Sequence, residues 1–246
     1  MWRLAALALA GCGRIAFDPF AVAEPHATVY IISGDGGAPT DLASLDLATG
    51  QMHILGTLDP SLGVLGGLAV WDDNTLYATS TGKLVQITLV PFSAVAIGPA
   101  PGSISALERD GDKLLAGDQL SSALLRFDPL ASGMAPEVYP VPNVDGGDVV
   151  HIGDTWYWFT NSGAPGAELF QLDAAYAPVP IGSPGDAGPY LSGLVIDDAG
   201  NLYGISDSDV IIPIDLATGA FGATTTMCIA CPTPYDFKSG DATRSP

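Results

Sequence analysis

Short apolar runs separated by turn sequences dominate this chain, and residues 192–219 show the pattern most clearly. The run LVI at 194–196 is followed by DDAGN, which is typical of a tight turn because Asp, Asn and Gly tolerate positive φ. The run LYGI then returns as the second strand of a hairpin, and VIIPI forms a third strand that ends at the turn DLATG. With a fourth strand over 220–225, this stretch predicts a four-stranded antiparallel unit.

The unit recurs along the chain with a nearly constant period. The turn that ends the third strand occurs around residues 46, 88, 128, 173 and 215, at spacings of 42, 40, 45 and 42 residues. The strand after the first turn gives an independent marker, as LY, LL, WY and LY at residues 76, 114, 156 and 202. A period of about 40 residues with four strands in each unit is typical of a β-propeller blade. We therefore predict an all-β fold, a β-propeller of five blades with four strands each, with six blades as the alternative.

The first unit lacks its opening strand, because VYII at 29–32 already matches the second strand of the other units. We expect a C-terminal strand to complete this blade and close the ring, which removes a free sheet edge. The alternating segment YDFKS at 235–239 is the predicted closing strand. Pro213 falls within a predicted third strand, and because proline cannot donate to the ladder we expect a bulge there.

The composition agrees with this architecture. A chain of 246 residues with 48% apolar content can bury a substantial core in one all-β domain. The 30 Gly and 20 Pro residues are too many for long helices and suit short strands joined by turns. We therefore assign residues 27–246 to a single β-propeller domain.

The first residues of the chain have the layout of a secretory signal. Residues 1–12, MWRLAALALAGC, combine one basic residue with a short apolar run and small residues before Cys12. The run is too short to span a bilayer. We assign residues 1–11 to a signal peptide and residues 12–26, which contain two prolines and little periodicity, to a tether.

The four residues LAGC that end at Cys12 resemble the lipobox of bacterial lipoproteins. This resemblance implies cleavage before Cys12, lipidation of its sulfur and acylation of the new amino group, and several acyl chains anchor a protein stably. Gly13 does not resemble an inner-membrane retention signal, so the resemblance favours the outer membrane, at its periplasmic or its surface side. An ordinary secretory signal with an incidental cysteine is the alternative.

The net charge of −19 bears on two kinds of ligand, nucleic acids and divalent cations. Nucleic acid is disfavoured, because binding to phosphates needs patches of Lys and Arg. The acidity serves solubility or divalent cation binding. The acids are scattered and no Ca²⁺-binding loop motif is present, so we predict no cofactor or metal site and keep Ca²⁺ as the one possibility.

The residues that could carry chemistry do not form a catalytic motif. Cys228 and Cys231 are the only close pair of cysteines, and in an exported chain we expect them to form a structural disulfide. His26, His53 and His151 are far apart in the sequence. No nucleophile elbow, metalloprotease motif or phosphate-binding loop appears, so we predict no catalytic residue.

One face of the predicted propeller is the candidate binding face. The loops between second and third strands share this face with the loops between blades, and loops on a rigid scaffold often carry function. We expect a protein or glycan partner there, and a monomeric propeller. The candidate binding residues are Asp35, Asp118, Gln119, Asn161, Tyr190 and Asp207.

The run GLVIDDAGNLY followed by IDLATG resembles the repeats of NHL-like, YVTN-like and SMP-30-like propellers. This resemblance implies the fold over nearly all of residues 27–240. Neither Gly50 nor Gly219 is followed by the Trp that quinoprotein repeats carry, so a quinone cofactor is not implied. The central Glu and Asn set of the metal-dependent lactonases cannot be placed in this sequence.

These observations favour a non-catalytic, lipid-anchored propeller of the cell envelope that binds a partner or ligand on its loop face. Propellers also host enzymes, so a metal-dependent hydrolase or lactonase remains an alternative. A purely structural envelope protein is a further alternative.

Overall fold

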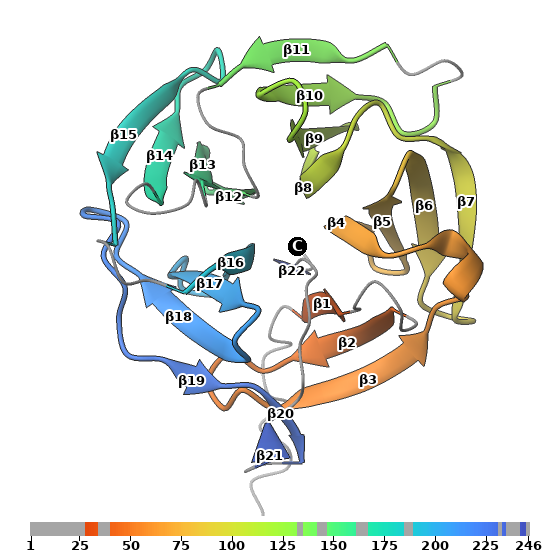
Figure 1. Cartoon of the computed structure of the whole chain (residues 1–246), viewed down its shortest axis with the longest axis horizontal. Helices are drawn as coiled ribbons and strands as arrows, with labels where there is room; N and C mark the ends of the chain where they lie inside the picture. Colours follow the sequence, from red (N-terminus) through yellow and green to blue (C-terminus); the bar gives the residue numbers. More distant parts are fainter. Residues whose placement is uncertain are drawn as a thin grey trace, which may run out of the picture.

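The computed structural model describes residues 28–33, 40–131, 135–141, 147–160, 167–184, 189–230, 233–234 and 242–244. These residues form five four-stranded sheets arranged around a central axis, as the blades of a β-propeller (Figure 1). The predicted fold is therefore confirmed, with five blades rather than six.

The first three blades have the following strands from the axis outward. Blade 1 contains β22 (Ala242–Arg244), β1 (Val29–Ser33), β2 (Asp41–Leu45) and β3 (Met52–Thr57). Blade 2 contains β4 (Leu65–Asp72), β5 (Thr75–Ser80), β6 (Lys83–Thr88) and β7 (Ser93–Pro99). Blade 3 contains β8 (Ile104–Asp110), β9 (Lys113–Asp118), β10 (Ala123–Phe127) and β11 (Glu137–Pro140).

The remaining strands complete the ring. Blade 4 contains β12 (Asp148–Ile152), β13 (Thr155–Thr160), β14 (Glu168–Leu172) and β15 (Pro178–Gly182). Blade 5 contains β16 (Leu191–Ile196), β17 (Leu202–Ser206), β18 (Val210–Ile214) and β19 (Thr225–Thr226). A short 3₁₀ helix, η1 (Pro60–Leu62), joins blades 1 and 2, and β20 (Cys228–Ala230) pairs with β21 (Thr233–Pro234) after blade 5.

The ring is closed by a strand from the C-terminal end of the chain, as predicted, but by a different segment of it. β22 pairs with β1 in antiparallel register, with Val29 opposite Arg244 and Ile31 opposite Ala242. The predicted closing segment, 235–239, lies outside the described residues. Three residues suffice because β22 also contacts the innermost strands of both neighbouring blades, and the Thr243 hydroxyl accepts the Val70 N–H of β4 at 3.3 Å.

The two ends of the propeller axis differ in their connections. We call one end the loop face, where each blade connects to the next and the outward-running hairpins turn at residues 81–82, 119–122 and 207–209. The opposite end, the turn face, carries the hairpin turns at 73–74, 111–112 and 153–154 and both DLATG turns. β1 starts at the turn face and β22 ends there, because these strands are antiparallel.

The repeated DLATG sequence is explained by the hydrogen bonds of its first residue. The Asp46 carboxylate accepts the N–H groups of Ala48 and Thr49 at 2.8 and 3.1 Å, and Asp215 accepts those of Ala217 and Thr218 at 2.7 and 3.1 Å. The glycines that end these turns have φ values of 73° and 72°. An Asp that caps the turn and a Gly that closes it are what this backbone requires.

The described residues form five apolar core clusters, one between each pair of neighbouring blades. The side chains of each blade alternate between its two neighbours, so Ala106 packs toward blade 4 while Leu107 packs toward blade 2. Trp158 is fully buried between blades 3 and 4. Its ring occupies the space beside Gly117, since a Cβ added to this glycine would lie only 2.5 Å from the ring. Small and large residues therefore complement each other across the blade interfaces.

The bulge predicted at Pro213 does not occur in the pairing of β18 with β17, whereas on the outer side the register changes by one residue between the pairs Ile211–Thr225 and Ile214–Phe221. β17 and β18 pair without a register shift, and Tyr203 lies opposite Pro213. The Pro213 carbonyl accepts the Gly222 N–H at 2.8 Å on the outer side of the strand. Since N–H and C=O of one strand residue point the same way, the missing N–H lies on that outer side and the β17 ladder loses nothing.

Several predicted features lie outside the described residues: the signal peptide, Cys12, the tether and Cys231. These assignments stay predictions. Within the part of the chain that the structure describes, no helix has the length and apolar character needed to cross a bilayer.

Candidate binding site at the loop face

A pocket of about 640 Å³ opens on the loop face, over the first residues of the inner strands β4, β8 and β16. Its walls come from blades 2, 3 and 5, together with the turns at 81–82 and 119–122. We call it the loop-face pocket. Its volume falls within the range of roughly 300–1,000 Å³ that is usual for ligand sites.

Among the described residues, no Asp, Glu, Lys, Arg or His side chain lines the loop-face pocket. The whole chain carries 27 acidic and 8 basic residues, so an uncharged surface of this size stands out against the rest of the molecule. A charged ligand would find no ion-pair partner among these lining residues. The described part of the lining therefore offers hydroxyl, amide and apolar groups to a ligand.

Apolar and aromatic side chains form part of the pocket rim. Leu120 is 83% exposed, Tyr190 is 49% exposed and Val64 is 37% exposed. A half-exposed Tyr presents an apolar ring face together with a polar hydroxyl. These side chains offer contact area to a ligand that enters from the loop face.

The other main component of the lining is a set of six hydroxyl-bearing residues: Thr79, Ser80, Thr81, Ser103, Ser105 and Ser192. The Thr79 hydroxyl accepts the Gly67 N–H at 3.0 Å and lies 3.4 Å from the Ile104 carbonyl, so it links blades 2 and 3. The buried hydroxyls of Ser80 and Ser192 have no hydrogen-bond partner among the described residues. Buried polar groups are almost always paired, which marks these two as groups with unused hydrogen-bonding capacity beside the pocket.

Of the six predicted binding residues, two line this pocket: Gln119 and Tyr190. Asp207 lies exposed in the β17–β18 turn, where its carboxylate is 3.4 Å from the Ser206 hydroxyl, and it does not line the pocket. Asp35 and Asn161 lie outside the described residues. The structure therefore brings together part of the predicted set.

Asp118 is buried, and its carboxylate anchors two residues that line the loop-face pocket. Its carboxylate accepts the Ser103 N–H at 2.8 Å and the Leu120 N–H at 3.3 Å. A Cβ at Gly102 would lie 2.7 Å from this carboxylate, so glycine lets the chain pass over it. Asp118 therefore positions Ser103 and Leu120, and its own carboxylate is occupied by these backbone groups.

Sequence reasoning missed the hydroxyl residues of the pocket. Ser103, Ser105 and Ser192 stand at or just before the starts of inner strands, in the segments SIS and LSG. Small hydroxyl residues at equivalent starts of the repeated unit were the available signal. Half of the candidate residues instead came from acidic loop positions, and one of these, Asp118, serves to anchor a loop.

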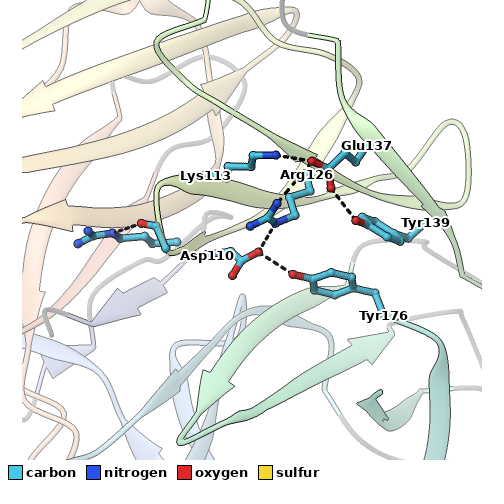
Figure 2. Close-up of polar contacts among 8 residues, drawn as sticks. Asp110, Lys113, Arg126, Glu137, Tyr139 and Tyr176 are labelled. Atoms are coloured by element: carbon cyan, nitrogen blue, oxygen red, sulfur yellow. Dashed lines mark hydrogen bonds and ion pairs between the residues drawn. The ribbon is translucent and has the colours of Figure 1, made fainter. Parts of the chain in front are cut away.

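A second polar cluster lies toward the turn face between blades 3 and 4 and is structural (Figure 2). Arg126 forms ion pairs with Asp110 and with Glu137, and Lys113 also pairs with Glu137. Hydrogen bonds from Lys113 and Tyr139 lower the pKa of Glu137 to about 2. Every charge in the cluster has a partner, which leaves little capacity for a ligand.

Tyr176 joins this cluster to blade 4. Its hydroxyl donates to Asp110 at 2.6 Å, and its ring centroid lies 4.6 Å from that of Tyr139 (Figure 2). Burial and the bond to Asp110 raise the pKa of Tyr176. The cluster therefore fastens the two blades together rather than forming a reactive site.

The described residues contain no group of three or more His, Cys, Asp or Glu side chains that could hold a metal ion. The carboxylates that recur in the hairpins cap turns: Asp72 accepts the Asn74 N–H at 2.9 Å, and Asp197 accepts the Ala199 N–H at the same distance. Cys228 is disulfide-bonded, and its partner lies outside the described residues, so the pairing with Cys231 stays a prediction.

Comparisons with known proteins identify the fold and no more. A chain in the crystal structure of a nidogen/laminin complex matches with a TM-score of 0.58 and 14% identity, over 89% of this chain and 98% of that one. Streptogramin B lyase matches with a TM-score of 0.49 and 13% identity, over 87% of this chain and 72% of the lyase chain. No protein-family model matches the sequence, and the comparison with curated proteins gives no match. At 14% identity the likeness to the nidogen/laminin chain supports a β-propeller and is silent on function.

Proposed function

We propose that the protein is a lipid-anchored, non-catalytic β-propeller of the bacterial cell envelope that binds an uncharged saccharide in its loop-face pocket. The observation that carries this proposal is the lining of that pocket: six hydroxyl residues, one amide, one half-exposed tyrosine and no ionisable carboxylate or amine among the described residues. Ligand sites are mostly apolar with a few placed polar groups that fix orientation.

Saccharides match this lining better than other ligand classes do. A sugar ring has an apolar face that packs on an aromatic side chain such as Tyr190, and its hydroxyls exchange hydrogen bonds with exposed groups such as Gln119 and Thr81. A nucleotide or an acidic glycan needs cationic groups, which the described lining residues do not offer. A protein partner would meet a concave pocket rather than the broad surface of a typical interface.

The positions of the strands support a role for the loop face in an anchored protein. β1 begins with Val29 at the turn face, and the lipidated Cys12 would precede it by a tether that spans at most roughly 60 Å. A tether attached at the turn face allows an orientation in which the loop-face pocket opens away from the membrane. The pocket is then accessible to ligands in the surrounding compartment.

The proposal is tested by applying the protein without residues 1–12 to an array of neutral and acidic oligosaccharides. We expect binding to neutral glycans and no turnover of the bound glycan during incubation. Binding confined to acidic glycans, or hydrolysis of the glycans, would contradict the proposal. Absence of binding to any glycan would also contradict it, and would favour a protein partner.

A further inference from the structure

A second cavity, of about 210 Å³, lies at the other end of the propeller axis, toward the turn face. It is lined by residues from the inner strands of all five blades: β4, β8, β12, β16 and β22. We call it the turn-face cavity. Its volume is below the roughly 300 Å³ at which sites for drug-sized ligands begin, so it suits a small group.

The turn-face cavity collects positive charge in an acidic protein. Its lining includes two of the 8 Lys and Arg residues of the chain, Arg109 and Arg244, together with His151, whose ring can donate an N–H. Arg109 donates from Nε to the Gly111 carbonyl at 2.9 Å, donates also to the Trp71 carbonyl, and lies 4.9 Å from the centre of the Trp71 ring. These contacts do not neutralise the positive charge of Arg109, and no carboxylate among the described residues pairs with it.

Arg244 provides an independent indication that an acceptor belongs in this cavity. One terminal nitrogen of its guanidinium donates to Asp198, but the buried Nε has no acceptor in the described part of the chain. A buried donor on a charged group without an acceptor is costly and calls for an unseen water or ion. An oxygen atom in the adjacent cavity would satisfy it.

The one carboxyl group of the lining does not oppose an anion at neutral pH. Burial, with a smaller contribution from the charge of Asp148 on β12, raises the pKa of Glu108 to about 8 against the lowering effect of the Arg109 N–H bond. Glu108 is therefore mostly protonated at pH 7. The cavity lining also includes Arg109, His151 and Arg244, and Asp198, which is not part of the lining, is paired with Arg244.

We propose that the turn-face cavity is a binding site for a tetrahedral oxyanion of sulfate or phosphate size, held by Arg109, His151 and Arg244. The anion is either a free ion or the phosphate of a lipid headgroup, because the chain enters β1 at this same face. This site is separate from the loop-face pocket, and its existence does not depend on the saccharide proposal.

The first test is calorimetric titration with sodium sulfate, at an ionic strength kept constant with sodium chloride. We expect saturable binding by the protein without residues 1–12 and a loss of about tenfold or more in affinity for Arg109→Gln. Lys83→Gln is the matched control, because Lys83 bonds the Ser61 carbonyl at 3.0 Å near the loop face and is not part of the cavity. Equal effects of the two substitutions, or binding that chloride replaces fully, would overturn the proposal.

The second test uses Glu108, which acts on the anion only through its charge. Sulfate keeps its charge between about pH 7 and about pH 9, so ionisation of Glu108 should weaken sulfate binding by up to about tenfold over this range. Glu108→Gln should bind like the wild type at pH 7 and show a smaller pH dependence than the wild type. A pH dependence that persists unchanged in Glu108→Gln would contradict the assigned geometry.

Vesicles distinguish the two sources of the anion. Flotation with phosphatidylglycerol vesicles, but not with phosphatidylcholine vesicles, that is lost in Arg109→Gln identifies a lipid headgroup. Sulfate binding without flotation identifies a free oxyanion. If neither sulfate nor the anionic vesicles bind in an Arg109-dependent way, the proposal is wrong.

Discussion

The carboxylate of Asp148 on β12 accepts the backbone N–H of Leu194 on β16, and so joins the inner strands of blades 4 and 5. Asp148 is 3% exposed, and it also accepts the N–H of Val149 at 2.7 Å. Similar links join other neighbours, since Ser105 of β8 lies 3.4 Å from the Gly147 carbonyl that precedes β12. The inner strands are thus connected across blades by side chains, in addition to the apolar clusters.

Removing the Asp148 carboxylate should destabilise the ring. Asp148→Ala leaves two backbone N–H groups without their acceptor in a buried position, and we expect the free energy of unfolding to fall by about 2–4 kcal/mol. Urea denaturation measures this change. Asp207→Ala, at an exposed loop position, is the control and should change stability by less than about 0.5 kcal/mol. Similar effects of both substitutions would contradict the role of Asp148.

Two glycines with nearly the same backbone conformation should respond differently to substitution. Gly50 and Gly82 have φ values of 73° and 71°, but a Cβ at Gly50 would lie 2.1 Å from the Thr226 carbonyl oxygen, whereas nothing lies within 4 Å at Gly82. Both alanine variants bear the conformational cost of about 1–2 kcal/mol. Gly50→Ala should lose at least about 2 kcal/mol more, because it also displaces the chain that leads out of blade 5. Urea denaturation of the two variants measures the difference, and equal losses would contradict the close approach at Gly50.

The stability of the protein should fall as the pH rises from about 4.5 to about 8, through the titration of Glu108. Because burial raises the pKa of Glu108 to about 8, the folded state holds its proton over a range in which the unfolded state has released it. The penalty is absent below the unfolded pKa and complete above the folded one. Denaturation at several pH values should show a loss on the order of a few kcal/mol that Glu108→Gln removes. The same pH dependence in both proteins would assign it to other groups.

Lipidation at Cys12 has a direct test in cells. Cys12→Ala should abolish labelling with an alkyne fatty acid and leave an unprocessed precursor, because the acyl chains attach to this cysteine and its new amino group. Cys231→Ala serves as the control and should be labelled like the wild type. Labelling that persists in Cys12→Ala would show that the anchor is elsewhere or absent.

The features that the sequence predicted well are local in origin. The DLATG turns were recognisable because the side chains of Asp46 and Asp215 cap their own turns, accepting the N–H groups two and three positions ahead. Their regular spacing then implied the blade number. Such signals need no knowledge of contacts between blades.

The features that the sequence did not predict depend on contacts between distant segments. β22 was missed because three residues show no periodicity, and its place is set by Val29 and Val70, more than 170 positions earlier. The pocket was missed because Ser80 and Ser192 come together only when the ring has closed. Acidic loop residues looked functional in isolation, although Asp118 proves to be a buried anchor for the rim of the loop-face pocket.

The most direct test of the central claim compares two exposed leucines on the glycan array. Leu120, 83% exposed, lines the loop-face pocket, whereas Leu130, 71% exposed, lies toward the turn face after β10. Neither substitution by alanine should affect folding, since both side chains are exposed. We predict that Leu120→Ala weakens binding to neutral glycans by about tenfold while Leu130→Ala binds like the wild type. Unchanged binding by Leu120→Ala, or equal losses in both variants, would contradict a saccharide site in the loop-face pocket.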